Sequence, residues 1–281
     1  MRLSAIVPIV MLTGLAPAAQ AAGEGHVMPL YAEPVWDGLP ITNSMVMTWV
    51  ATLLIIAFSW LATKRMTLVP AGLQNLAEWM VESLYTFLEG LIGHHMVKRT
   101  FWFLGSIFFL IITVNYLGLF PGVGTVGRVD DGHYIPFLRG GNADLNMTAA
   151  MALLFAVLWF YWAIAENGFK GFMAHIFAPK GSFKGLMMAM MVPVFLFVGV
   201  LEVISIMIRP VALTFRLYGN IYGGEQTLEK LMALAPAPFS FAPALPFMFV
   251  ELLVGFVQAL VFTLLCAIFI KLICDHGDEH H

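Results

Sequence analysis

Charged residues are scarce in this sequence. Only 11% of its 281 residues are Asp, Glu, Lys or Arg, whereas 60% are hydrophobic. A soluble domain carries about a quarter charged residues, so this shortage excludes an ordinary soluble domain and predicts an integral membrane protein. The net charge of −3 provides no strongly basic surface, which argues against nucleic acid as a partner.

Cysteines and catalytic motifs are also scarce. Cys266 and Cys274 lie eight residues apart on one expected helix, roughly 12 Å at the usual helical rise, which is too far for a disulfide. We interpret both as packing residues. The sequence contains no P-loop, zinc-ligand spacing or nucleophile motif, so we expect neither cofactor nor metal. His94-His95 is a candidate haem or metal pair, although a pair of surface histidines is the simpler interpretation.

The N-terminus has the pattern of a secretory signal. Arg2 precedes an apolar stretch, and Ala19-Gln20-Ala21 has the small-residue form of a cleavage site. This predicts a signal peptide over residues 1–21, with an uncleaved tail as the alternative. In either case, the segment 22–43 is expected outside the cytoplasm.

The rest of the chain, residues 44–275, is predicted to form a single all-α transmembrane domain. Residues 73–92 show apolar positions at helical spacing with glutamates between them, which predicts an amphipathic surface helix. Segments 123–144 and 167–185 are expected to be loops, and 276–281 a cytoplasmic tail. Five apolar segments are long enough to span a bilayer; they cover residues 44–62, 101–120, 147–165, 186–234 and 247–274.

Basic residues set the expected orientation. If the N-terminus lies outside and the C-terminus in the cytoplasm, the acidic loop residues Asp130, Asp131 and Asp144 are outside and solvated. Arg128 and Arg139 are then outside as well, with Lys230 near the outer end of its span. Most basic residues fall inside, as the positive-inside rule requires: Lys64, Arg65, Lys98, Arg99, Lys170, Lys180, Lys184 and Lys271.

The segment 186–234 is too long for an upright span. A helix of this length extends over roughly 70 Å, whereas a bilayer core is about 30 Å thick. It must therefore bend, tilt steeply or break, and we predict that the last two helices are long and tilted. A proline cluster between 236 and 246 separates them. Candidate hinges are Pro193, Pro210, Gly219, Gly223 and Gly224.

Ionisable residues inside the spans are the candidate functional groups. Glu202, Arg209 and Arg216 are seven residues apart and therefore share one helical stripe, which Asn220 extends. Glu202 and Arg209 can form a structural ion pair as readily as a functional one. Arg216 has no carboxylate within a helical turn and stays charged, so we expect its acidic partner on another helix or another protein.

Two glutamates complete the set of buried charges. Glu225 lies roughly opposite Arg216 around a regular helix. Glu251 and Gln258 are seven residues apart in the last span and share a face. Either glutamate can become neutral by taking up a proton, and groups that gain and lose protons inside a membrane are what a proton path needs.

Several motifs resemble subunit a of F-type ATP synthases. The main motif runs from Glu202 to Glu225 and includes Arg209-Pro210, Arg216-Leu217 and Gly219-Asn220. The stretches "NYLGLFPG" (115–122), "ADLNMT" (143–148) and "FVQALVFTLL" (256–265) match further family patches in family order. The resemblance covers roughly residues 40 to 275.

The resemblance implies a non-catalytic, ion-translocating stator subunit in the bacterial inner membrane. Its partners are a rotating ring of c subunits, the b subunits of the peripheral stalk and the remaining ATP synthase subunits. Two half-channels would carry protons to and from the ring carboxylates. Arg216 matches the essential arginine that faces those carboxylates. The other matching positions are Glu225 and Glu251 on the outward half-channel, Asn220 and Gln258 beside the arginine, and Glu202 in a less defined acidic role.

The sequence departs from many relatives in carrying glutamate at both half-channel positions, 225 and 251, and Ala212 where a serine is common. The coupling ion, H⁺ or Na⁺, is set largely in the ring and stays open at this point. Two other interpretations remain: a secondary transporter or channel acting alone, and a haem-binding anchor subunit that uses His94 or His95.

Overall fold

The computed structural model describes residues 31–36, 40–124, 127–130, 133–177, 186–234, 236, 239 and 241–274. The predicted signal peptide and the C-terminal tail lie outside these residues. Within them the chain forms helices α2 (Asn43–Thr63), α3 (Leu73–Ile92), α4 (His94–Gly118), α5 (Leu145–Phe177), α6 (Leu186–Ala233) and α7 (Phe241–Cys274).

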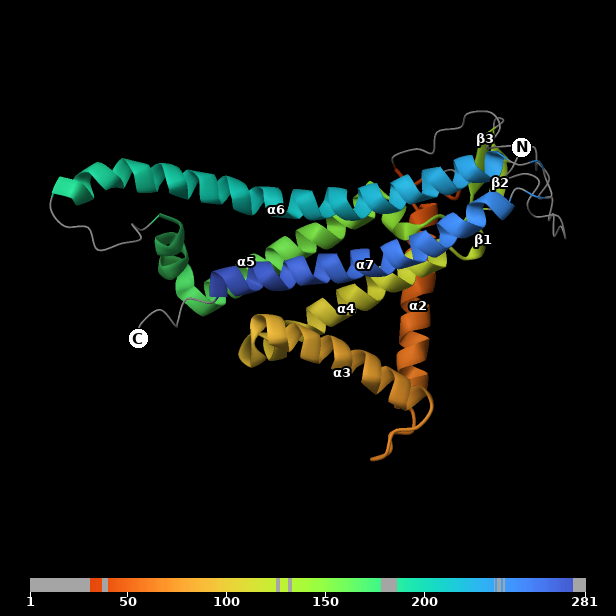
Figure 1. The fold of residues 1–281 in the computed structure, drawn as a ribbon, viewed down its shortest axis with the longest axis horizontal. Coiled ribbons are helices and arrows are strands. Elements are labelled where there is room, and N and C mark those ends of the chain that lie inside the picture. Colours follow the sequence, from red (N-terminus) through yellow and green to blue (C-terminus); the bar gives the residue numbers. More distant parts are fainter. Residues whose placement is uncertain are drawn as a thin grey trace.

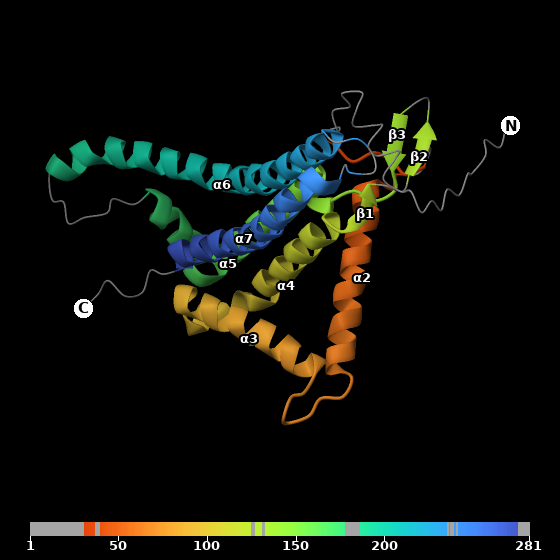
Figure 2. The same ribbon diagram turned by 45° about the vertical axis from the view of Figure 1, so that its right-hand side comes forward.

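The helices form one membrane-type bundle. In Figure 1, α6 and α7 run in the same general direction with α5 beside them, and α2 stands across this direction. Figure 2 shows the same crossing from a second angle, with α3 bridging the foot of α2 and the far end of α4. Five helices are long and apolar enough to cross a membrane, and they correspond to the five predicted spans. The all-α fold class with two long final helices is therefore confirmed.

Helix boundaries agree with the predictions where apolar character and helix end together. Helices α2, α3 and α6 match 44–62, 73–92 and 186–234 within a residue or so. Helix α4 begins at His94 and not at residue 101. Only Gly93, with a φ of 80°, separates it from α3. Hydropathy marks where the apolar part of a helix begins, whereas polar residues can extend the helix beyond it.

Two further expectations about helix ends are wrong. The expected loop 167–185 is helical up to Phe177, with a break at Gly168 (φ 67°). Helix α7 starts at Phe241, so neither Pro243 nor Pro246 interrupts the chain there. A proline in the first turn of a helix removes an N–H that has no intrahelical partner anyway.

The predicted hinges do not break α6. It continues as one helix from Leu186 to Ala233 with Pro193 and Pro210 inside it, and the ribbon is only gently curved (Figure 1). One prolyl carbonyl is engaged, because the Thr214 hydroxyl donates to Pro210 O at 2.9 Å. A helix of this length was expected to bend, tilt or break. Helix α6 does not break, and it runs across the direction of α2.

The expected loop 123–144 contains short ordered elements. Strands β2 (Gly127–Asp130) and β3 (His133–Pro136) form an antiparallel hairpin with Gly127 opposite Pro136. Strand β1 (Pro121–Gly124) precedes them, and the 3-10 helix η1 (Gly141–Ala143) follows. This small hairpin sits at one end of the bundle, near the start of α2 (Figure 2). We call this the hairpin end.

The η1 segment inserts among the helices and does not lie on the surface. It packs against α2, α4, α5 and α6, and Gly141, Asn142 and Ala143 are all buried. A Cβ at Gly141 would lie 2.8 Å from both Thr48 Oγ1 and Val114 Cγ1, so only glycine fits without a shift. A loop segment thus becomes part of the interior that positions the site.

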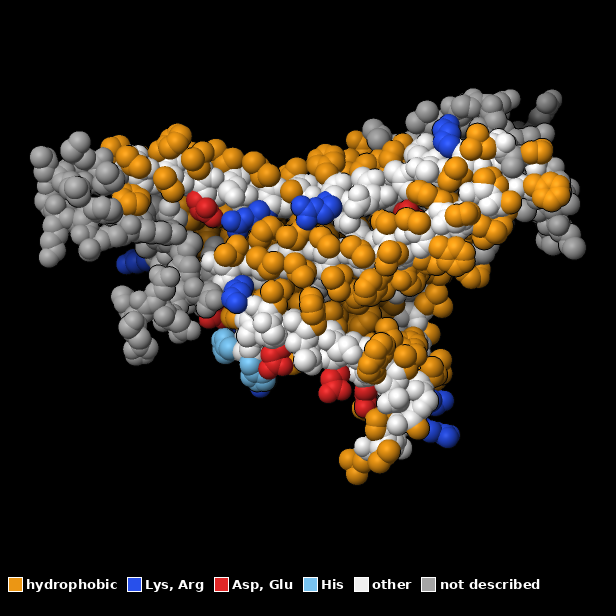
Figure 3. Space-filling model, in the orientation of Figure 1, with side chains coloured by type: hydrophobic (Ala, Val, Ile, Leu, Met, Phe, Trp, Pro, Cys, Tyr) orange, Lys and Arg blue, Asp and Glu red, His pale blue; other side chains and the backbone are white. Residues whose placement is uncertain are grey.

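The two long helices differ in how much the rest of the chain covers them. In its most apolar window α7 is 44% buried, whereas α6 is only 11% buried. The surface in Figure 3 is largely hydrophobic, with few charged side chains along α6. Exposed apolar area of this extent indicates contact with lipid or with another protein.

Candidate ion-translocation site

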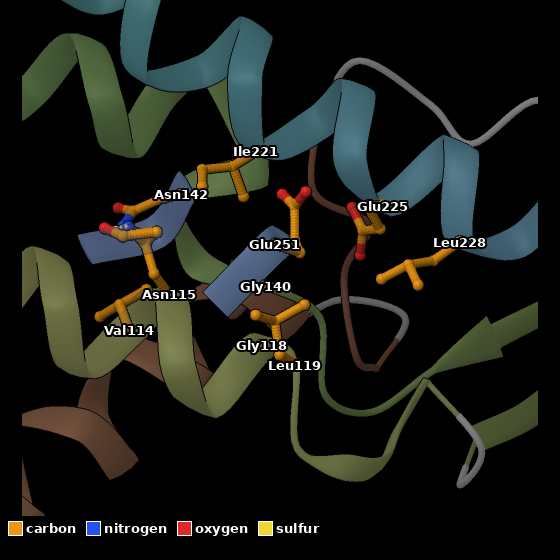
Figure 4. Close-up of a pocket in the computed structure, with 11 residues that line it drawn as sticks. Val114, Asn115, Gly118, Leu119, Gly140, Asn142, Ile221, Glu225, Leu228 and Glu251 are labelled. Atoms are coloured by element: carbon orange, nitrogen blue, oxygen red, sulfur yellow. Dashed lines mark hydrogen bonds between the residues drawn. The ribbon is translucent and has the colours of Figure 1, made fainter. Parts of the chain in front are cut away.

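A cavity with polar side chains in an otherwise apolar lining lies toward the hairpin end, between α4, α6, α7 and the loop before η1. Glu225 of α6 and Glu251 of α7 line it together with Asn115, Gly140 and Asn142, and Figure 4 shows the two carboxylates between the same helices. The cavity offers about 40 Å³ of room for water. That is more than the roughly 10–15 Å³ that one water molecule needs, so hydrated proton transfer is sterically possible.

Glu225 faces a buried arginine. Arg139 Nε lies 3.5 Å from Glu225 Oε2, and Arg139 is only 3% exposed. The guanidinium also donates to Tyr31 O at 3.1 Å and to Ala143 O at 3.4 Å. The polar segment that was expected to be a loop thus holds Arg139 in the interior. The insertion of the η1 segment carries this cation into the protein beside the first of the predicted glutamates.

Glu251 lines the same cavity from α7. Its side chain is 5% exposed, and the described residues give it no ion pair. It packs against Gly224 of α6 so closely that a Cβ at this glycine would collide with the Glu251 carboxylate. The glycine expected to be a hinge instead makes space for a carboxyl group.

Amide side chains connect the cavity with its surroundings. Asn142 donates to Asn115 Oδ1 at 2.6 Å, and Asn115 donates to Gly255 O of α7 at 3.0 Å. On the other side, Asn220 Nδ2 of α6 donates to Gln258 Oε1 of α7 at 2.7 Å. The structure thus brings together Asn220 and Gln258, which the sequence could only place on separate helices.

The expectation that Asp144 is solvated is wrong. It is 4% exposed and therefore not solvated. Its Oδ1 accepts from Asn146 N at 3.1 Å at the start of α5, which is the geometry of an N-cap. Such a cap satisfies a helix N–H that has no intrahelical partner, so this carboxylate is held locally.

Glu202 and Arg209 form the ion pair that the sequence allowed. Arg209 Nη2 donates to Glu202 Oε1 at 3.2 Å. The guanidinium carbon also lies 4.9 Å from the centre of the Phe269 ring and 5.9 Å from that of Trp159. Cation–π contacts at such distances stabilise a desolvated cation. Arg209 therefore has its counter-charge and its packing within the chain.

Arg216 has neither. It is exposed, and the part of the chain that the structure describes offers it no ion pair. Exposed apolar or small residues lie beside it, among them Ala212, Gly219 and Phe215, whose side chain is 59% exposed. A cation on an apolar, outward-facing surface is unfavourable in lipid, so its environment is incomplete in this chain alone.

Sequence reasoning placed the helical candidates but missed parts of the cavity. Asn115 and Asn142 lie in or beside stretches that resemble family patches, and this proximity was the available signal. Asp144 precedes a helix, which is an N-cap position. For Arg139 and for Glu229, which interacts electrostatically with Glu225, no periodic pattern singled out the residue.

The fold and the cavity define a class of protein: a multi-pass membrane protein that moves ions past ionisable side chains. The family model described as ATP synthase A chain matches residues 45–271. The chain is 34% identical to ATP synthase subunit a of Solidesulfovibrio magneticus, over 86% of this chain and 89% of that one. It is 30% identical to ATP synthase subunit a of Desulforamulus reducens, over 96% of this chain and 100% of that one.

The chain belongs to the ATP synthase subunit a family. It is the proton-translocating stator subunit of the membrane F0 sector, resides in the bacterial membrane and is part of the F-type complex with the other subunits. This decides against the stand-alone transporter and the haem anchor. The His94 side chain is 71% exposed, and its Nδ1 lies 2.6 Å from Glu89 Oε1, in agreement with a surface position.

Proposed function

We propose that Arg216 is the fixed cation that faces the carboxylates of a rotating c-ring. The observation that carries this proposal is its exposure without an ion pair in the described residues, on the least covered helix of the bundle. Arginine does not lose its proton in proteins. A carboxylate on a neighbouring, moving subunit is therefore the simplest way to satisfy it.

The surface around Arg216 is suited to another helix. Ala212, Gly219 and Gly223 lie on the exposed side of α6, and a Cβ added at either glycine would meet nothing within 4 Å. Small residues let helix backbones approach closely in membranes. Together with the exposed apolar side chains nearby, they support close packing of c subunits against α6.

We further propose that the cavity is the outward-opening half-channel. Protons would reach Glu225 and Glu251 from the hairpin end and pass to the ring near Arg216. The Asn220–Gln258 hydrogen bond lies between α6 and α7, one turn beyond Arg216, where it can orient water or the ring carboxyl. The predicted orientation, with the N-terminus outside and the C-terminus in the cytoplasm, puts the hairpin end on the extracytoplasmic side.

In the proposed cycle, each ring carboxyl releases one proton and takes up one proton as it passes this subunit. A protonated ring carboxyl that arrives at Arg216 releases its proton to the inward half-channel and becomes an anion. At an effective dielectric near 20, an anion about 4 Å from the guanidinium gains about 4 kcal/mol. The next proton from the outward half-channel neutralises the anion and allows it to move back into lipid.

Arg216 also blocks a direct leak, because a permanent cation repels a bare proton between the half-channels. Each proton that moves through 100 mV supplies about 2.3 kcal/mol, which drives rotation. No covalent bond is made in this subunit, so we propose a non-catalytic role. The b subunits of the peripheral stalk would hold it against the moving ring.

Photo-crosslinking tests the proposed partner. A photoreactive benzophenone side chain replaces Phe215, which is 59% exposed beside Arg216, and in a second sample it replaces Trp60 of α2, which is 58% exposed. In membranes that contain the whole complex, the Phe215 probe should capture subunit c, and the Trp60 probe should not. Equal capture of c from both positions, or capture only of other proteins at 215, would contradict the proposal.

A further inference from the structure

Arg139 is a buried cation placed by a loop. Two of its guanidinium nitrogens donate to main-chain oxygens, one of Tyr31 before α2 and one of Ala143 in η1. Its third nitrogen, Nε, lies 3.5 Å from Glu225 Oε2. The backbone contacts fix the position of the guanidinium, and the charge is directed at one carboxylate of the cavity.

The two glutamates of the cavity are therefore unequal. Glu225, with its side chain 22% exposed, has a guanidinium beside it. Glu251 is almost fully buried and faces the glycine backbone of α6. An adjacent cation stabilises a carboxylate as the anion, whereas burial without a cation favours the neutral acid. The guanidinium therefore favours a negative charge on Glu225, whereas the described residues place no cation beside Glu251.

Two charged neighbours act on Glu225 in opposite senses, a cation that favours its anion and a carboxylate that opposes it. Arg139 from the loop and Glu229 from the next turn of α6 interact with Glu225. Asp144 and Tyr218 interact within the same group, and Glu251 faces it from α7. Several carboxyl groups thus lie near one another, one of them in contact with the cation, and such groups do not all ionise together. The position of the cation decides which one keeps its negative charge.

We propose that Arg139 is a positioning residue that holds Glu225 as an anion, so that Glu251 is the carboxyl that takes up and releases the transported proton. In each step a proton that enters from the outside is relayed by water in the cavity to the Glu251 carboxylate, which forms an O–H bond, and the water is left unchanged. Glu251 then gives this proton to the ring carboxylate and returns to the anion. Arg139 keeps its proton throughout, and the Glu225 anion attracts the next one. This inference rests on the proposed outward half-channel.

Two substitutions separate charge from structure. Arg139→Lys keeps the cation but loses the fork that reaches two carbonyls, whereas Arg139→Gln keeps a donor and loses the charge. Proton flux through the assembled complex in vesicles is measured across a range of pH and normalised to complex content. With Arg139→Gln, the Glu225 anion loses its stabilising partner and takes up a proton at higher pH. The flux profile should shift upward by about one pH unit, as expected for loss of a nearby opposite charge.

Arg139→Lys should keep the wild-type position of the pH profile even if its maximum is lower. If both variants lose flux equally with an unshifted profile, Arg139 is only a structural clamp and the proposal is overturned. Arg99→Gln is the matched control, because Arg99 pairs with Glu166 between α4 and α5, away from the cavity. Its profile should be unchanged.

A double variant tests the assignment to Glu225. Once Glu225→Gln has removed the anion, adding Arg139→Gln should cause little further loss, so the two effects should not multiply. Multiplying losses would contradict the proposal. If Glu225→Gln and Glu251→Gln separately leave flux unchanged, the half-channel itself is wrong, and this failure is distinct from that of the Arg139 assignment.

Discussion

The cavity and the exposed face of α6 differ in whether the chain itself supplies partners for their charged side chains. In the cavity, Glu225 has Arg139 beside it, and Glu251 is enclosed by the chain. On the exposed face, Arg216 lies seven residues beyond the paired Arg209. It has no ion pair within the described residues, and the exposed apolar side chain of Phe215 lies beside it. The cavity therefore contains a counter-charge within this chain, whereas the cation on the exposed face requires one from a partner.

This difference assigns two tasks to one helix. Glu225 and Arg216 are nine residues apart on α6, so they point in roughly opposite directions around a regular helix. One side of α6 faces α7 and the proton supply, and the other faces outward. Between them, Asn220 reaches Gln258 of α7. A helix with two such faces can deliver protons to a surface along which another subunit moves.

Removal of both carboxyl groups from the cavity should have a large effect on proton flux. We expect Glu225→Gln combined with Glu251→Gln to lower proton flux roughly 100-fold, the lower range for loss of positioned proton-transfer groups. The complex should still assemble, because the amides have nearly the same shape. A pH-sensitive dye in vesicles reports the flux. Flux at the wild-type level would show that protons take another route and that the comparison between the two faces is misplaced.

A smaller effect should follow from crowding the cavity without changing its charge. A Cβ at Gly224 would collide with the Glu251 carboxylate, so Gly224→Ala should displace this group and reduce flux about tenfold, since small misplacements of reacting groups are costly. Gly90→Ala in α3 is the control, because no atom lies within 4 Å of a Cβ there. If both variants behave like the wild type, the close packing of Glu251 against α6 has no functional role.

The membrane-spanning helices were predictable from the sequence, because apolar runs of this length are typical of transmembrane helices. The helical stripe of Glu202 and Arg209 also predicted their ion pair, since both residues lie on one helix. Contacts between helices were not predictable in this way. The Asn220–Gln258 bond and the fit of Glu251 against Gly224 depend on how α6 and α7 pack.

The loop before α5 shows the main failure of sequence reasoning. Its polar, glycine-rich composition predicted a solvated loop, yet Arg139 and Asp144 are buried. Glycines let the segment pack closely among helices, and Gly141 fits where a Cβ would be crowded. The same composition describes an exposed loop and an inserted one, because burial of a polar segment is decided by partners distant in sequence, such as Glu225.

The most direct test of the account compares the two arginines of α6. Arg216→Ala and Arg209→Ala are each introduced, and ATP-driven proton pumping is measured in vesicles and normalised to assembled complex. Loss of Arg216 should reduce pumping by at least about 100-fold, as for removal of a preorganised charge from a reacting site. Arg209→Ala should lower the amount or thermal stability of the complex but keep pumping per complex. Normal pumping by the Arg216 variant, or equal losses in both, would contradict the claim that Arg216 meets its counter-charge on a moving subunit.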